Sequence, residues 1–252
     1  MIEIFILSLI QGITEFLPVS SSSHLILTSK YLNFDNQSLS IDVSLHIGSF
    51  VAVLFYFRKE IIKFVDNKVI FFKILMSSIP VMIVGFFLVE TGIIEKLRNI
   101  KIIALMTIIF AILLYISDKF KLDKNINEDF TYKSAIFIGC FQILSLIPGV
   151  SRSGIAITAA RLLNFKRVDA AKVSFLISIP ILGAVSAFGV KNLIMSEDLN
   201  FTYINLLSIV LSFFFSLITI KYFLSYINKF NLNIFVYYRV FLGLVLIILA
   251  YL

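Results

Sequence analysis

The sequence predicts an all-α polytopic membrane protein built as an inverted internal repeat, with six transmembrane helices and two re-entrant helix-loop-helix hairpins. Its 252 residues are 60% apolar, with a mean hydropathy of +1.01, whereas soluble domains are about 45–50% apolar. Six apolar stretches are long enough to cross a bilayer, and two other apolar regions are interrupted by polar segments that contain proline. One membrane domain over residues 1–252 is therefore expected.

The six predicted spans follow from length, since a spanning helix needs about 20 mostly apolar residues and sometimes about 17. The stretches that qualify are 43–57, 70–90, 101–118, 172–190, 203–222 and 234–252.

The apolar regions 1–32 and 133–164 are broken, the first after Pro18 and the second after Pro148. Each break leaves two half-helices of about 12–15 residues, a length that favours a re-entrant hairpin over a span. Irregular backbone at membrane depth is tolerated where protein buries it or where it lines a wet cavity.

The two broken regions belong to matching halves of the chain. Pro18 and Pro148 lie 130 residues apart, Val43-Ser44-Leu45 recurs at the same offset as Val173-Ser174-Phe175, and Leu32-Asn33-Phe34 recurs 131 residues later. A first repeat over 1–118 and a second over 133–252 are expected, each with one hairpin and three spans. Three spans per half invert the second repeat relative to the first, and inverted repeats place sites near the midplane at discontinuous helices.

Basic residues divide unequally between the two sides that this topology defines. Of the 22 Lys and Arg residues, 16 lie in 58–73, 119–133, 161–172 and 221–239, and five lie in 30–42, 90–101 and 191–202. Cytoplasmic loops carry the excess of Lys and Arg, so both termini are expected to be extracytoplasmic. The segment 161–172 is expected to hold the second hairpin against anionic cytoplasmic lipid. The net charge of +7 thus indicates membrane lipids as partners and no nucleic acid.

Gln11 and Glu15 share one face of the first half-helix, because they lie four residues apart. A carboxylate in an apolar membrane segment is costly and is a functional candidate by default. The alternative is a structural hydrogen bond to another helix.

A run of four serines and a histidine, Ser20 to His24, follows Pro18. Serine is a favoured N-cap, and the N-terminus of the half-helix that restarts here offers free N–H groups and a partial positive charge to a phosphate. Capping explains one or two serines, not four followed by His24. The histidine could act as a general acid, base or nucleophile, or only as a hydrogen-bonding partner.

The second break supplies Ser151, Arg152, Ser153 and Gly154. An arginine at membrane depth needs an anion, and its planar fork suits phosphate. A salt bridge from Arg152 to Glu15 is the alternative, and an empty phosphate site could contain the same bridge. His46 is expected to have a packing or hydrogen-bonding role. Gln142 could support the site as Gln11 does.

Two motifs resemble those of the bacterial undecaprenyl pyrophosphate phosphatases, also called bacitracin-resistance proteins. The segment 11–25, QGITEFLPVSSSSHL, is similar to their (E/Q)xxxE motif with its following proline, serines and histidine, and the segment 148–154, PGVSRSG, is similar to their PGxSRSG motif. The resemblance covers essentially the whole chain. Gln11 is uncharged where some members have Glu, and Ser23 stands where members usually have Gly.

The resemblance implies hydrolysis of undecaprenyl diphosphate to undecaprenyl phosphate and phosphate in a bacterial cell membrane. This reaction recycles the lipid carrier of peptidoglycan synthesis and gives resistance to bacitracin. Ser21 is the preferred nucleophile, with His24 as acid/base; His24 itself and an activated water are the alternatives. The predicted residues are Glu15, Ser21, His24 and Arg152 for catalysis, Gln11, Ser20, Ser22, Ser151 and Ser153 for phosphate binding, and Glu15 with Gln11 for a divalent cation, Mg²⁺ or Ca²⁺.

A transporter of the lipid carrier is the main rival, because inverted repeats with broken helices are a transporter architecture. A transporter needs no nucleophile or acid/base, so Glu15, Ser21 and His24 favour the enzyme. A membrane scaffold would not need a buried Glu and Arg. The oligomeric state stays open, a homodimer included.

Overall fold

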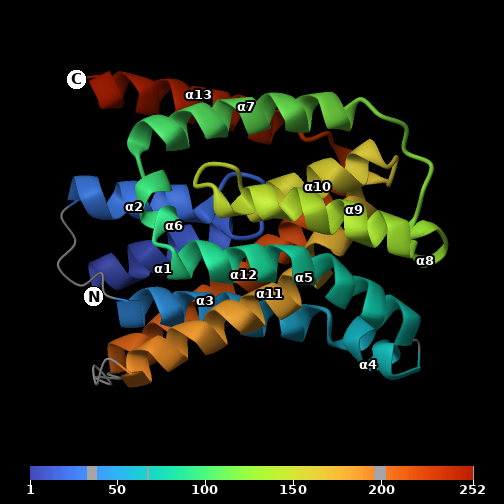
Figure 1. The fold of residues 1–252 in the computed structure, drawn as a ribbon, viewed down its shortest axis with the longest axis horizontal. Helices are drawn as coiled ribbons and strands as arrows, with labels where there is room; N and C mark the ends of the chain where they lie inside the picture. Colours follow the sequence, from blue (N-terminus) through green and yellow to red (C-terminus); the bar gives the residue numbers. More distant parts are fainter. Residues whose placement is uncertain (33–38, 67, 196–202, 252) are drawn as a thin grey trace.

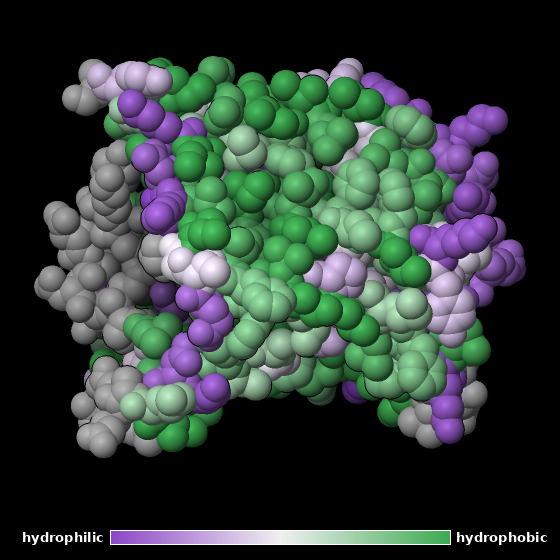
Figure 2. Space-filling view, viewed as in Figure 1, coloured by the Kyte–Doolittle hydropathy of each residue, from purple (hydrophilic) through white to green (hydrophobic). Residues whose placement is uncertain are grey.

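Six long apolar helices form the body of the computed structural model, which describes residues 1–32, 39–66, 68–195 and 203–251. They are α3 (Leu39–Tyr56), α5 (Lys68–Glu90), α7 (Ile100–Asp118), α11 (Arg167–Met195), α12 (Tyr203–Lys229) and α13 (Asn233–Tyr251). All six are long and apolar enough to cross a membrane, and they run between the same two ends of the molecule (Figure 1). Figure 2 shows an apolar band between hydrophilic ends. The prediction of an all-α multi-pass membrane protein is confirmed.

The helices extend further than the apolar stretches that predicted them. Predicted spans 172–190 and 203–222 correspond to Arg167–Met195 and Tyr203–Lys229, because the helical backbone continues through the charged residues at the ends of each span. Three short helices were not predicted: α4 (Arg58–Asp66), α6 (Ile93–Leu97) and α8 (Ile126–Asp129). They lie in segments that the sequence had suggested only as loops.

Both broken regions form pairs of short helices, as expected. The first consists of α1 (Ile2–Thr14) and α2 (Ser21–Leu32); the second consists of α9 (Tyr132–Gln142), the 3₁₀ turn η1 (Ile143–Leu146) and α10 (Arg152–Leu162). Ile147 is extended, with φ −84° and ψ 121°, as sterics require of a residue that precedes proline. In Figure 1 the first pair returns to the end that holds both termini, and the second returns to the opposite end.

Equivalent helices of the two halves make equivalent contacts. Helix α1 packs on α12 as α9 packs on α5, and α3 packs on α12 as α11 packs on α5. A Cβ added to Gly12 or Gly139 would come within 2.6 Å of α12 or α5, so glycine permits both close crossings, as small residues do between membrane helices. Helices α3 and α11 run in opposite directions, as do α7 and α13 (Figure 1). These pairings support an inverted repeat; Asn33 and Phe34 of the matching tripeptide lie outside the described residues.

Helix α10 lies inside the bundle, although it is only 11 residues long. Ala156, Ile157, Ala159 and Ala160 are all buried in the main hydrophobic core, which also contains Phe175 of α11. A half-helix that ends at membrane depth leaves backbone groups that lipid cannot satisfy. Enclosure by α7, α9 and α11 therefore allows the second break to lie in the interior.

Candidate active site

The two breaks end in the same uncommon backbone conformation. Ser20 has φ 75° and Ser151 has φ 73°, in a region that side chains other than glycine rarely adopt. Each serine precedes the first residue of a half-helix, Ser21 of α2 or Arg152 of α10. Such strain persists where the surrounding structure enforces it, often at functional sites. The conformation of these serines directs the first turns of α2 and α10 toward the same part of the interior.

The Glu15 carboxylate lies where the two breaks meet. It forms an ion pair with Arg152 from the other half of the chain. The Ser21 hydroxyl donates to Glu15 Oε2 at 2.6 Å, and Gln11 Nε2 donates to the same oxygen at 3.2 Å. Because a buried charge is tolerated only when it is paired and hydrogen-bonded, these partners explain how Glu15 stays 6% exposed. The salt bridge that was the alternative to phosphate binding by Arg152 is therefore present in the structure.

A cavity of about 660 Å³ lies in front of the Glu15–Arg152 pair. Glu15, Ser20, Ser21, Ser151 and Arg152 line its inner end, and α5 and α11 supply apolar walls. The wall residues Met82, Phe86, Val89 and Val185 are also strongly exposed at the protein surface, so the cavity is open between α5 and α11. It combines an ionic inner end with walls that are mostly apolar, and Arg98 also lines it.

Some of the other residues predicted to bind phosphate lie away from the cavity. Ser153 does not line the cavity; its hydroxyl donates to the Leu17 carbonyl at 2.7 Å, which ties the second break to the first. The side chain of Ser22 is outside the part of the structure that is described. Gln142, the counterpart of Gln11 on α9, is buried but does not line the cavity. Of the serines predicted to bind phosphate, Ser20 and Ser151 therefore line the cavity, next to the candidate nucleophile Ser21.

His24 is the one of the four predicted catalytic residues that does not line the cavity. Its Nδ1 donates to the Ser20 carbonyl at 2.7 Å, and its ring stacks on Tyr238 of α13. A neutral ring that donates at Nδ1 accepts at Nε2, here from the Tyr238 hydroxyl at 2.5 Å. The other three predicted catalytic residues, Glu15, Ser21 and Arg152, line the same cavity. The bond to Ser20 explains why His24 does not, because it turns the ring toward α13.

His46 contributes more than its position in the sequence suggested. It lines the cavity, and its Nδ1 lies 3.0 Å from Gln11 Nε2. The hydrogen-bonding role expected for it is present, but the bond is to the residue that supports Glu15. The residue at the matching position of the second half is Leu176, so the repeat carries no signal for this contact.

Two arginines that the sequence interpretation assigned to charged loops are wholly buried. Arg239 lies in α13 beside the breaks, and Arg161 lies at the end of α10. Arg161 pairs with Asp118 and donates to the carbonyls of Lys121, Phe120 and Phe165, so it was wrongly expected to contact lipid. Each sits within or beside an apolar run, where an arginine is rare and indicates a specific partner. That signal was missed for both.

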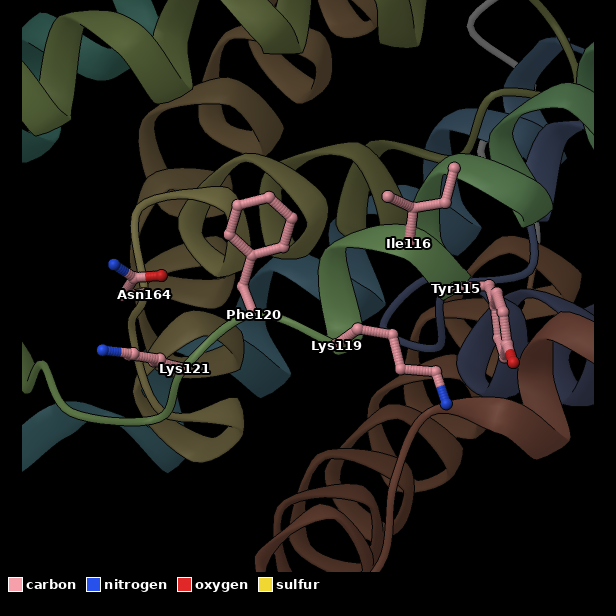
Figure 3. Close-up of a pocket in the computed structure, with 6 residues that line it drawn as sticks. All are labelled: Tyr115, Ile116, Lys119, Phe120, Lys121 and Asn164. Carbon is pink, nitrogen blue, oxygen red and sulfur yellow. The ribbon is translucent and has the colours of Figure 1, made fainter.

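A second cavity, of about 600 Å³, lies at the end of α7 away from the breaks. Figure 3 shows its lining side chains, which are Tyr115, Ile116, Lys119, Phe120, Lys121 and Asn164. Arg161 fixes the backbone of this loop from beneath, through the carbonyls of Phe120 and Lys121. No carboxylate is among the described residues that line this cavity, so the chemistry predicted for Glu15 is confined to the first one.

Comparison with known proteins identifies the family of this chain. Residues 4–245 match the family of the bacitracin resistance protein BacA. The undecaprenyl-diphosphatase of Pelagibacter ubique (strain HTCC1062) is 49% identical over 251 residues, which cover 99% of this chain and 98% of the relative. Those of Campylobacter curvus (strain 525.92) and Jannaschia sp. (strain CCS1) are 39% and 36% identical, each over 98% of this chain and 97% and 98% of the relative. The resemblance seen in the two motifs is confirmed, and the chain belongs to the bacitracin resistance protein BacA family.

Proposed function

We propose that the protein hydrolyses undecaprenyl diphosphate to undecaprenyl phosphate and inorganic phosphate, and so recycles the lipid carrier of cell-wall synthesis. One observation carries the proposal: the Ser21 hydroxyl donates at 2.6 Å to a carboxylate that also pairs with Arg152. A nucleophile, a base and a cation for phosphate thus meet at the inner end of a cavity with apolar walls. That combination suits a substrate with an anionic head and a long apolar tail.

The reaction that fits these contacts is in-line attack on the terminal phosphorus. Ser21 Oγ forms the new P–O bond as Glu15 accepts its proton, and the bond to the bridging oxygen breaks with its electron pair on the departing undecaprenyl phosphate. Water then cleaves the phosphoserine and releases phosphate. Arg152 stabilises the charge on the transferred group, where positioning and electrostatics supply most of the catalysis. Attack by water held at Glu15 is the second route that the same contacts support.

A divalent cation fits this donor set only together with the substrate. Glu15 is the one carboxylate among the described residues that line the cavity, and no cluster of three His, Cys, Asp or Glu side chains occurs in the described part of the chain. Gln11 Oε1 is buried without a hydrogen-bond partner among those residues. Mg²⁺ is typically bound through one or two carboxylates plus substrate phosphates, so Glu15 with Gln11 would hold it. When bound, the ion would neutralise charge on the diphosphate.

Phosphate release from the purified, detergent-solubilised protein tests the proposal. Undecaprenyl diphosphate should release phosphate, and undecaprenyl phosphate should not, because the monophosphate lacks the phosphoric anhydride bond. A transporter alone would release none, because it moves the lipid without cleaving the phosphoric anhydride bond. Absence of phosphate release from folded protein would therefore favour the transporter.

The apolar groove between α5 and α11 is proposed to hold the polyprenyl tail. Ala184 lines it, whereas Ala187 on the same helix is exposed and does not. Ala184→Trp is expected to raise KM for undecaprenyl diphosphate about tenfold by overfilling the groove. The effect should be smaller for a short-chain prenyl diphosphate. Ala187→Trp is the matched control, and an equal rise in KM for both variants would argue against this route for the tail.

The cavity is proposed to open on the extracytoplasmic side. Its lining includes Val89 in the last turn of α5 and Arg98 between α6 and α7. The end of α5, helix α6 and the beginning of α7 lie at the end of the molecule that holds both termini (Figure 1). Without the two buried arginines, 14 basic residues remain in the segments expected to be cytoplasmic, against five on the other side. This distribution still favours termini outside the cell.

Thiol labelling of intact cells tests this orientation. In a Cys140→Ser background, Asn99→Cys should react with a membrane-impermeant reagent, and Asn127→Cys should react only after the cells are opened. Both asparagines are exposed. Asn99 immediately precedes α7, and Asn127 lies in α8, beyond the other end of α7. The reverse pattern of labelling would place the cavity mouth on the cytoplasmic side.

A further inference from the structure

Arg239 is the only described residue whose side chain donates hydrogen bonds to both breaks. Its Nη1 donates to the Pro18 carbonyl at 3.3 Å, and its Nη2 donates to the carbonyls of Gly149 and Val150 at 2.9 and 3.0 Å. It is 0% exposed and does not line the cavity. We propose that Arg239 is a positioning residue, which clamps the two breaks so that Glu15 and Arg152 meet. The inference rests on the proposed phosphatase activity.

The three carbonyls are placed where a clamp would act on the site. Pro18 lies two residues before Ser20, and Gly149 and Val150 immediately precede Ser151. These are the two serines with positive φ, and the residues after them bear the nucleophilic hydroxyl and the guanidinium. Fixing the peptide groups before each serine therefore fixes the directions in which Ser21 and Arg152 leave the breaks.

The chemistry of the side chain supports this role over a packing role. Every hydrogen bond of Arg239 to the described residues goes to a main-chain carbonyl, and a charged side chain inside a span is costly. An apolar residue would fill the space but leave three carbonyls at membrane depth without these donors. The planar fork reaches acceptors in two directions at once, which the single ammonium of lysine does not.

Two further contacts show that α13 packs closely against both breaks. A Cβ added to Gly154, in the first turn of α10, would lie 3.0 Å from Arg239 Nη1. Tyr238, the preceding residue, donates to His24 in the first turn of α2. Adjacent residues of α13 thus contact the beginnings of both half-helices. His24 would then act through α2, as part of the same support.

Arg161 provides a matched control, because it is also wholly buried and also donates to main-chain carbonyls, but in the loop after α7. Arg239→Met is expected to lower kcat about 100-fold, the effect of misplacing reacting groups by about 1 Å. KM should change by less than about threefold, because the groove walls do not include Arg239. Arg239→Lys should retain no more than about a tenth of kcat. Arg161→Met and Arg161→Lys should lower thermal stability but leave kcat of the folded protein near that of the wild type.

A double-mutant cycle separates positioning from general damage. If Arg239 acts through the Glu15–Arg152 pair, Arg239→Lys should cost much less kcat in an Arg152→Lys background than alone, since coupled residues are non-additive. Additive losses, a loss confined to KM, or equal kcat losses in the Arg239 and Arg161 variants would overturn the inference. Should Arg239→Met not fold, Arg239→Lys with its cycle still decides. Wild-type protein without phosphate release would instead refute the proposed function.

Discussion

Arg152→Lys is expected to lower kcat for phosphate release about 1,000-fold, the lower end of what an arginine contributes to phosphoryl transfer. Lysine keeps the positive charge, so the ion pair with Glu15 and the fold should survive. It loses the planar fork that can hold two oxygens of the transferred group. The measurement is steady-state phosphate release, with thermal unfolding as the check on folding.

The control for this variant is Arg58→Lys, since Arg58 lies on the exposed helix α4 and donates only to the Phe55 carbonyl among the described residues. It should keep normal turnover. Near-normal turnover of Arg152→Lys would mean that Arg152 only pairs with Glu15 and does not contact the transferred phosphate.

Glu15→Gln is expected to lower kcat about 100-fold to 10,000-fold, the range for loss of a general base. Glutamine keeps the shape and can still contact Ser21 and Gln11, but it cannot take the proton of Ser21. Glu60→Gln on the exposed surface of α4 is the control and should be fully active. Turnover of Glu15→Gln within a few-fold of the wild type would exclude Glu15 as the base.

Chelation separates the two roles proposed for Glu15. Excess EDTA should abolish phosphate release by the wild type, and added Mg²⁺ should restore it. Full activity in EDTA would remove the cation from the mechanism while leaving the proton transfer to Glu15 intact. Chelation is needed because Glu15→Gln would impair both the proton transfer and the binding of the cation.

The spans and breaks could be predicted because their signals are local. Apolar length identifies a membrane helix, and Pro18 and Pro148 with the serines that follow identify the breaks. The contact between Glu15 and Arg152 could also be anticipated from the sequence, because the offset of about 130 residues places the two breaks at matching positions of the repeat. Such patterns depend on chain order and period, which the sequence contains directly.

The contacts of His24, His46 and Arg239 could not be predicted in the same way. They depend on side-chain directions between elements far apart in sequence, such as α13 against both breaks. His24 shows the difference most clearly. Its position in the first turn of α2 was predicted, but its bond to the Ser20 carbonyl directs the ring to Tyr238 and away from the cavity.

The ion pair between Glu15 and Arg152 makes substrate binding a competition. A diphosphate that enters the cavity must take the guanidinium from a carboxylate already bound to it, so the resting enzyme opposes the occupancy on which its turnover depends. Glu15→Gln removes the competitor. In excess EDTA, where no cation links the carboxylate to the substrate, this variant should bind a non-hydrolysable diphosphate analogue more tightly than the wild type does. The same competition helps product phosphate to leave, because the Glu15 carboxylate forms its ion pair with Arg152 again and displaces the phosphate.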